Sequence, residues 1–135
     1  MFQSAVPLSR PVSAPLAIVV YEHLVLGNQL GNKLRDMGYR VTMLKEPGKV
    51  IEVAGKEKPL IVLVDLDCTV TDAVALIGQL KHTDGTRHLP VLCFTSHDDK
   101  KRQEAAVAAG ASLVVGDQAI LHQFPHLLDQ VLQVE

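Results

Sequence analysis

The feature that most constrains this chain is an apolar run that ends on a carboxylate. Five branched apolar residues, 60–64, are followed directly by Asp65, and a second carboxylate comes at Asp67. A continuous apolar run of this length is typical of a strand buried on both faces, as in the parallel sheet of an α/β protein. Ligands of such sheets bind just beyond the carboxyl ends of the strands. The pattern therefore predicts that Asp65 lies at a functional site.

Strand and helix patterns alternate along the rest of the chain. Short apolar, β-branched runs indicate the strands, and apolar residues three or four positions apart indicate the helices. The predicted strands are 17–21, 39–44, 60–66, 90–95 and 113–115, and the predicted helices are 24–37, 47–54, 71–81, 98–109 and 124–133. Five strands alternating with five helices predict a doubly wound α/β fold, with right-handed crossovers and helices on both faces of a parallel sheet. Gly27 and Gly31 weaken the first helix but allow it to pack closely on the sheet.

Length and composition are those of one globular domain. At 135 residues, 47% of them hydrophobic and 21% charged, the chain is long and apolar enough to bury a full core. Residues 1–15 hold Pro7, Pro11 and Pro15 among serine and alanine, so we interpret them as a flexible N-terminal tail. Residues 16–135 form the predicted domain.

Charge and hydropathy exclude several classes of function. A formal net charge of −2 without a lysine and arginine stripe gives no reason to expect nucleic-acid binding. No apolar run approaches the roughly 20 residues that span a bilayer, and the N-terminus does not read as a secretory signal. Cys68 and Cys93 lack metal-ligand spacing, so we interpret them as reduced thiols beside buried strands. These features predict a cytoplasmic protein.

Several landmarks follow one another in a familiar order. Asp65 ends the third predicted strand, residues 89–91 read Leu-Pro-Val, Thr95 ends the fourth strand, and residues 108–112 read Ala-Ala-Gly-Ala-Ser. In these features the chain from Leu16 onward resembles a response-regulator receiver domain of two-component signalling. The resemblance implies a flavodoxin-like five-stranded sheet of order 2-1-3-4-5. It also implies that Asp65 is the phosphoacceptor and that Thr95 carries the hydroxyl that contacts the phosphoryl group.

Other positions differ from the receiver pattern. The two adjacent acids that hold Mg²⁺ in such domains correspond to residues 21–22, of which only Glu22 is acidic. The resemblance therefore implies a weakened Mg²⁺ site made by Glu22, Asp65 and the backbone carbonyl of Asp67. The lysine that pairs with a phosphoryl oxygen corresponds to Asp117, whose negative charge would repel that oxygen. These differences predict an atypical receiver.

The same segment also resembles the first motif of haloacid-dehalogenase-type phosphatases. In that family Asp65 would be the nucleophile and Asp67 the acid/base, while Thr95 and Asp117 would belong to the hydroxyl and metal motifs. Only one helix fits between Asp65 and Thr95, which leaves no room for a cap that excludes water. Two strand-helix units also precede the nucleophile strand, whereas that family begins its sheet there. The receiver resemblance is therefore the favoured one.

Each candidate residue also has a simpler structural interpretation. Asp67 reads more simply as a loop residue that caps the next helix than as an acid catalyst. Thr95 can satisfy local backbone groups at a strand end. His23 and His97 follow predicted strands and can supply a cation or a proton, but scattered histidines are usually surface residues.

Together these patterns predict an atypical receiver that acts through protein–protein interaction and is not an enzyme. The resemblance implies a sensor histidine kinase or another signalling protein as partner. It also implies a partner or homodimer face on the fourth helix, fifth strand and fifth helix, which includes residues 100–109 and 124–134. Three classes stay open: a phosphoaccepting switch, a phosphorylation-independent interaction module and a small phosphatase.

Overall fold

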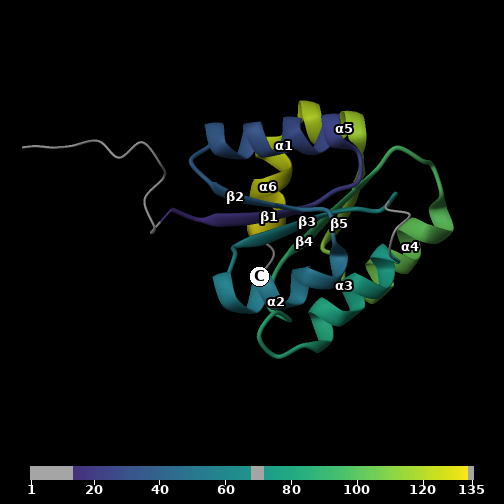
Figure 1. Ribbon diagram of the computed structural model, residues 1–135. Coiled ribbons are helices and arrows are strands. Elements are labelled where there is room, and N and C mark those ends of the chain that lie inside the picture. The colour runs from purple at the N-terminus through teal and green to yellow at the C-terminus, as the bar shows by residue number, and fades with distance from the viewer. Residues whose placement is uncertain (1–13, 68–71, 134–135) are drawn as a thin grey trace, which may run out of the picture.

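The sheet has the predicted topology. The computed structural model describes residues 14–67 and 72–133 (Figure 1). Five parallel strands lie in the order β2-β1-β3-β4-β5, which confirms the flavodoxin-like order 2-1-3-4-5. The strands are β1 (Leu16–Val20), β2 (Arg40–Leu44), β3 (Ile61–Asp65), β4 (Val91–Thr95) and β5 (Leu113–Gly116).

Burial follows the apolar pattern of the strands. Every residue of β1, β3 and β4 is buried, whereas the edge strands β2 and β5 are mostly half-buried. Asp65 pairs in register with Phe94, and Thr95 pairs with Gly116. Because all strands are parallel, their carboxyl ends meet at one edge of the sheet, and Asp65 and Thr95 lie there together.

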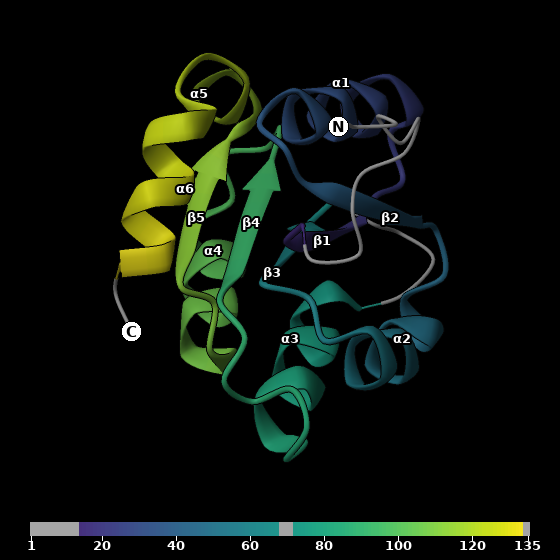
Figure 2. The same cartoon turned by 90° about the vertical axis from the view of Figure 1, so that its left-hand side faces the viewer.

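Helices cover both faces of this sheet. They are α1 (Leu24–Asp36), α2 (Val50–Glu57), α3 (Ala73–His82), α4 (Lys100–Ala109), α5 (Asp117–His122) and α6 (Phe124–Gln133), with a 3-10 turn, η1 (Pro47–Lys49), before α2. Buried side chains of α1, α5 and α6 pack on one face, and those of α2, α3 and α4 pack on the other (Figures 1 and 2). No helix in the described part of the chain has the length and apolar character that a membrane crossing requires.

The structure adds one helix to the five that were predicted. Asp117–His122 forms α5, directly after β5 and before the predicted last helix, which is α6. Six residues are too few for a 3.6-residue periodicity to be visible in the sequence. Tertiary packing explains why this helix forms, because Ile120 is fully buried in the same core as Phe124.

Some predictions fall outside the described residues. Residues 1–13 of the predicted tail and Cys68 belong to this group. Cys93 lies in β4 as a buried free thiol, and burial raises its pKa to about 12. A thiol with such a pKa stays protonated at neutral pH, which agrees with the interpretation of this cysteine as a reduced core residue.

Gly27 brings the first helix close to the sheet, as the sequence predicts. A Cβ atom at Gly27 would lie 2.6 Å from Cδ2 and 2.7 Å from Cγ of Tyr21. We expect Gly27→Ala to lower the free energy of unfolding by roughly 1 kcal/mol, because overpacking costs about 1–3 kcal/mol and alanine gains about 1 kcal/mol in helix propensity. Urea denaturation measures this change.

Gly78 in α3 provides the matched control. A Cβ atom there would meet nothing within 4 Å. Gly78→Ala should therefore raise the free energy of unfolding by about 0.5–1 kcal/mol. Equal changes in the two variants would show that Tyr21 does not limit the space at Gly27.

Candidate functional site

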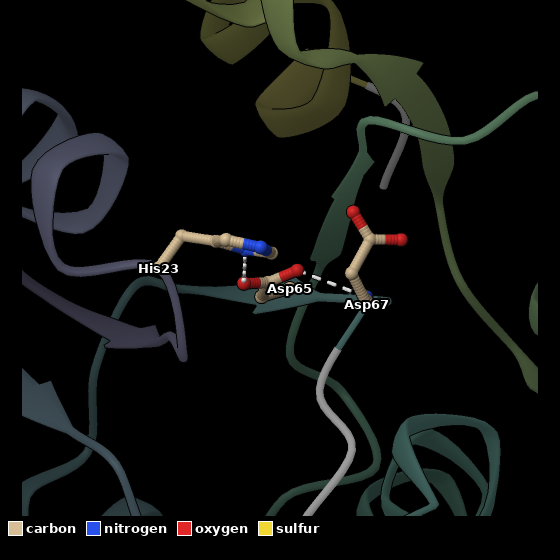
Figure 3. Close-up of side chains that lie close together, drawn as sticks. All are labelled: His23, Asp65 and Asp67. Atoms are coloured by element: carbon tan, nitrogen blue, oxygen red, sulfur yellow. Dashed lines mark hydrogen bonds and ion pairs between the residues drawn. The ribbon is translucent and has the colours of Figure 1, made fainter.

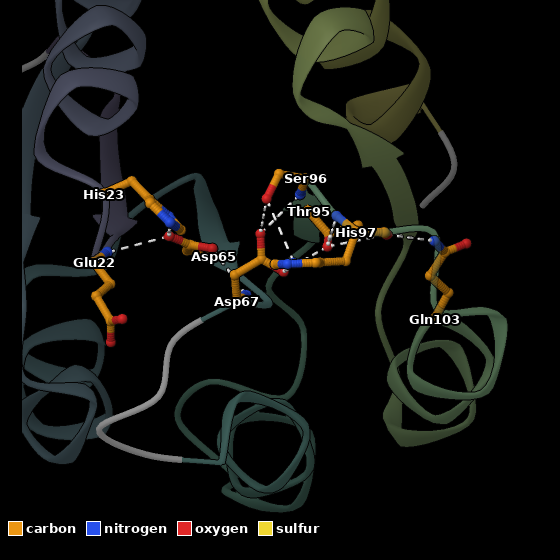
Figure 4. Close-up of polar contacts among 8 residues, drawn as sticks. All are labelled: Glu22, His23, Asp65, Asp67, Thr95, Ser96, His97 and Gln103. Atoms are coloured by element: carbon orange, nitrogen blue, oxygen red, sulfur yellow. Dashed lines mark hydrogen bonds and ion pairs between the residues drawn. The ribbon is translucent and has the colours of Figure 1, made fainter.

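The candidate site lies at the carboxyl ends of four strands. Glu22 and His23 follow β1, Asp65 and Asp67 come from the end of β3, and the residues from Thr95 to His97 end β4 and begin the next loop (Figure 4). Asp117 follows β5 directly. The fold thus gathers residues that are far apart in the sequence at one edge of the sheet, where ligands of such folds bind.

Asp65 is buried and held by three donors. Its side chain is 1% exposed. Oδ2 accepts a hydrogen bond from the backbone N–H of Glu22 at 3.2 Å and lies 3.1 Å from Nδ1 of His23, while Oδ1 accepts one from the backbone N–H of Asp67 at 2.9 Å (Figure 3). The loops after β1 and β3 therefore fix the direction of this carboxylate before any ligand arrives.

His23 provides the cation beside Asp65. Its ring is 51% exposed and lies over the buried carboxylate. The hydrogen bond to Asp65 raises the pKa of His23, although some burial opposes the change, and the charges of Asp65, Asp67 and Asp117 add to it. An imidazole with a raised pKa carries positive charge over a wider pH range than a free one. Of the two sequence interpretations of His23, the contact with Asp65 favours the source of a cation over the plain surface residue.

Asp67 joins two loops and does not cap the next helix. Its Oδ1 accepts a hydrogen bond from the Thr95 hydroxyl at 2.6 Å, and its Oδ2 accepts bonds from the backbone N–H and the hydroxyl of Ser96 at 2.7 and 2.8 Å. Nδ1 of His97 lies 3.0 Å from Oδ1. The predicted capping role is wrong for Asp67. Asp72 caps α3 instead, accepting hydrogen bonds from the N–H groups of Val74 and Ala75.

These donors keep Asp67 ionised. Burial by itself would raise the pKa of the Asp67 carboxyl, whose side chain is 6% exposed. The Ser96 N–H, the hydroxyls of Thr95 and Ser96 and the His97 ring outweigh that effect and hold the pKa well below its usual range. A carboxylate that accepts several hydrogen bonds in this way is favoured in its charged form.

Thr95 and Glu22 both lie at the site, where the structure shows their contacts with other groups of the protein. The hydroxyl of Thr95, which is 5% exposed, donates to Asp67 and accepts a hydrogen bond from the backbone N–H of His97 at 3.0 Å. Glu22 approaches Asp65 with its backbone N–H, and its carboxylate points away from Asp65 in Figure 4. The phosphoryl contact of Thr95 and the metal-ligand role of Glu22 remain predictions.

Asp117 brings a third carboxylate to this edge. Its Oδ1 is buried and has no hydrogen-bond partner among the residues that the structure describes. Burial and the negative charges of Asp67 and Asp65 raise its pKa, and the nearby His23 and His97 partly offset this effect. Together with Thr95, Ser96 and His97, Asp117 lines a pocket of about 470 Å³ beside the carboxylates. The side of the site opposite β1 is therefore anionic.

The side-chain donors that converge are His23, Asp65 and Asp67. One ligand atom from each residue lies within 4.8 Å of the other two. A divalent cation fits among them, but the set contains an imidazole nitrogen where a Mg²⁺ site has carboxylate oxygen. Mg²⁺ takes oxygen ligands in near-octahedral geometry, so this donor set suits it poorly.

The comparisons with known proteins concern the sequence and the fold of this chain. The sequence profile of the response regulator receiver domain matches residues 17–118. No curated protein matches the chain in sequence.

Several solved structures share the fold. A putative response regulator from Chloroflexus aurantiacus is 19% identical, with a TM-score of 0.82, and the match covers 90% of this chain and 99% of that one. The receiver domain of a sensor histidine kinase from Pseudomonas aeruginosa, solved with a magnesium ion in its active-site cleft, is 17% identical, with a TM-score of 0.80 and the same coverage. A beryllofluoride-activated receiver domain from Klebsiella pneumoniae is 22% identical, with a TM-score of 0.75, and the match covers 88% of this chain and 98% of that one.

Proposed function

Because this chain belongs to the response regulator receiver domain family, we propose that it is an atypical receiver that signals through contacts with other proteins and has Asp65 as a weak phosphoacceptor. The segment that contains β3 and Asp67 resembles both receivers and haloacid-dehalogenase-type phosphatases, and the family match favours the receiver. The phosphatase alternative would need Asp67 as a mobile proton shuttle. The four donors that bind its carboxylate argue against that role.

Asp65 has the surroundings of a nucleophilic carboxylate. In the proposed transfer, an oxygen of Asp65 attacks the phosphorus of a phosphorylated donor, the bond from phosphorus to the donor's leaving group breaks, and an acyl phosphate forms. Three hydrogen-bond donors already orient this carboxylate, so the attacking oxygen is positioned before the phosphorylated donor binds.

Asp117 is the reason to expect weak phosphorylation of Asp65. A receiver stabilises the new phosphoryl oxygens with a lysine at this position, whereas here a third carboxylate stands beside Asp65 and Asp67. Like charges in a partly buried site repel more strongly than in water. We therefore expect Asp65 to take up a phosphoryl group slowly and to a low final level.

Mg²⁺ is the metal expected from the family, and it would neutralise charge on the phosphoryl oxygens when bound. We propose that this chain holds it weakly, through Asp65 and the backbone carbonyl of Asp67 with Glu22 as the third group. The carboxylate of Glu22 would have to turn toward Asp65 to take part.

Phosphorylation-independent signalling is the second candidate function, and the polar network around Asp67 favours it. The Thr95 and Ser96 hydroxyls are already bound to Asp67, so the loop after β4 keeps its conformation without a phosphoryl group. In this alternative the partner binds the unphosphorylated protein in the conformation described above.

The proposed partner surface comprises α4, β5 and α6. Helix α4 buries only Ala106 of its ten residues, and Val107 on its outer side is 56% exposed. A weakly packed helix with exposed small and apolar residues gives a partner a surface to pack on, and few contacts with the protein core are disturbed when the partner binds. We propose that a sensor histidine kinase or another signalling protein is the partner at this face. We also propose that the same face can form a homodimer and that the protein acts in the cytoplasm.

Treatment with acetyl phosphate in millimolar Mg²⁺ tests the phosphoacceptor. We expect intact mass spectrometry to show a minor fraction of wild-type protein carrying one phosphoryl group. Asp65→Asn should show none, because an amide oxygen does not form the acyl phosphate. Asp84→Asn, a change at an exposed loop carboxylate, should behave like the wild type.

Other outcomes separate the remaining classes. A wild type without any adduct would point to the phosphorylation-independent module. Turnover of a generic phosphomonoester that is lost in both Asp65→Asn and Asp67→Asn would overturn the receiver proposal.

A further inference from the structure

Two of the three converging donors after β1 and β3, His23 and Asp65, already have the spacing of metal ligands. Nδ1 of His23 lies 3.1 Å from Oδ2 of Asp65, which is the separation that two ligands have when each is about 2.0–2.2 Å from one ion. The corresponding atoms of all three residues lie within 4.8 Å of one another. To reach the same ion, the Asp67 oxygen must move closer and exchange part of its hydrogen bonds to Thr95, Ser96 and His97 for the metal. His23 and Asp67 lie on either side of Asp65 in Figure 3, and the imidazole is half-exposed whereas both carboxylates are buried.

The negative charge of the carboxylates at this site favours the binding of a cation. Asp65, Asp67 and Asp117 place three carboxylates at one edge of the sheet, and one oxygen of Asp117 is buried without a hydrogen-bond partner in the described part of the chain. The ion pairs that the described residues make with Asp65 and Asp67 are both with imidazoles, those of His23 and His97. Imidazoles give up their proton to a metal ion readily, whereas a lysine would compete with it.

The identity of the donors selects the kind of metal. Mg²⁺ prefers oxygen ligands, whereas an imidazole nitrogen combined with carboxylates is the usual donor set of zinc and of cobalt, nickel or iron in the same oxidation state. Three protein ligands with the remaining positions open to water is also the arrangement of many accessible zinc sites.

We propose that His23, Asp65 and Asp67 form a binding site for a divalent transition-metal ion of the zinc class, in preference to Mg²⁺. Asp117 adds negative charge behind the ligands. His97 is a positioning residue, since its Nδ1 holds Asp67 from the far side at 3.0 Å, as second-layer groups commonly orient metal ligands. The inference concerns the same pocket as the proposed function but does not depend on phosphorylation of Asp65.

Titration of metal-free, tag-free protein with Zn²⁺ in an excess of Mg²⁺ tests the site, with Co²⁺ absorption as a second readout. We expect one equivalent to bind and the Co²⁺ spectrum to show nitrogen and oxygen ligation. His23→Gln should weaken Zn²⁺ binding at least tenfold, and Asp65→Asn should do the same. His97→Gln should weaken it less than His23→Gln. His88→Gln, a change at an exposed histidine in the loop before β4, should leave it unchanged.

The opposite results overturn the inference. Equal affinity in His23→Gln and His88→Gln would mean that Zn²⁺ binds to surface histidines elsewhere. Displacement of Zn²⁺ by Mg²⁺ at similar concentrations would mean that the pocket is an oxygen site after all. Circular dichroism of each variant checks that the fold is intact. Because the readout is metal binding, its outcome stands apart from the acetyl phosphate experiment, which reports on phosphoryl transfer to Asp65.

Discussion

We expect that replacing Asp67 with alanine lowers the free energy of unfolding by about 2–4 kcal/mol at neutral pH, and urea denaturation in the presence of a chelator measures this change. Four donors lose their acceptor together: the Thr95 hydroxyl, two groups of Ser96 and the His97 ring. A hydrogen bond to a charged group contributes about 1.5–3 kcal/mol. The expected loss is smaller than four such bonds, because Ser96 and His97 are exposed and water can replace the carboxylate there.

The effect of this substitution depends on pH in a defined direction. The pKa of Asp67 is lower in the folded protein than in the unfolded chain, where it is about 3.9. The stabilisation by its carboxylate is therefore fully present above that unfolded value and is lost as the pH falls below it toward the folded pKa. The difference between wild type and Asp67→Ala should therefore shrink as the pH falls below about 3.9.

Asp72→Ala is the matched control for Asp67→Ala. Asp72 also accepts two backbone hydrogen bonds, but at the exposed N-cap of α3. Its loss should cost about 1 kcal/mol, as N-cap substitutions usually do. If the two variants lost the same amount, the network around Asp67 would be no more than another helix cap.

The sheet was predictable because its sequence signal is local and strong. The apolar runs that became β3 and β4 contain no polar residue before Asp65 and Thr95, and both strands are completely buried. Parallel strands then place those two polar residues at one edge by geometry alone. Helix α5 carries no such signal, since it is held by the burial of Ile120 and the partial burial of Leu121 in a core built by distant segments.

The partners of the site residues were less predictable than their positions. The sequence placed Asp67 two residues after the strand, but its partners come from a loop about thirty positions later, and no local pattern specifies them. For His23 and His97 the sequence left two interpretations open, a surface residue or a source of a cation or a proton, because isolated histidines give no periodic signal. Their closeness to strand ends was the available clue, since in this fold every residue just after a strand faces the same edge.

We expect that replacing Asp117 with lysine raises the phosphorylated fraction of Asp65 at least tenfold in acetyl phosphate and Mg²⁺. The substitution removes a negative charge that opposes the phosphoryl group and supplies the cation that the family uses at this position. At an effective dielectric constant of 20, two charges 4 Å apart interact by roughly 4 kcal/mol, and a tenfold change needs only about 1.4 kcal/mol. Intact mass spectrometry of wild type, Asp117→Lys and the double variant with Asp65→Asn measures the gain and its dependence on Asp65.

Two further substitutions at carboxylates separate the causes of this gain. Asp117→Asn removes the repulsion without adding a cation, so its phosphorylated fraction should lie between those of wild type and Asp117→Lys. Asp129→Lys makes the same change in net charge on the exposed side of α6 and should leave the fraction unchanged. Asp117 also opens α5, where an acid favours the helix by about 0.3–1 kcal/mol, so a small loss of stability in Asp117→Lys is expected. If Asp117→Lys folds and still gains nothing, the residue does not face the phosphoryl position, and the low capacity of Asp65 must come from the loop groups that are already bound to Asp67.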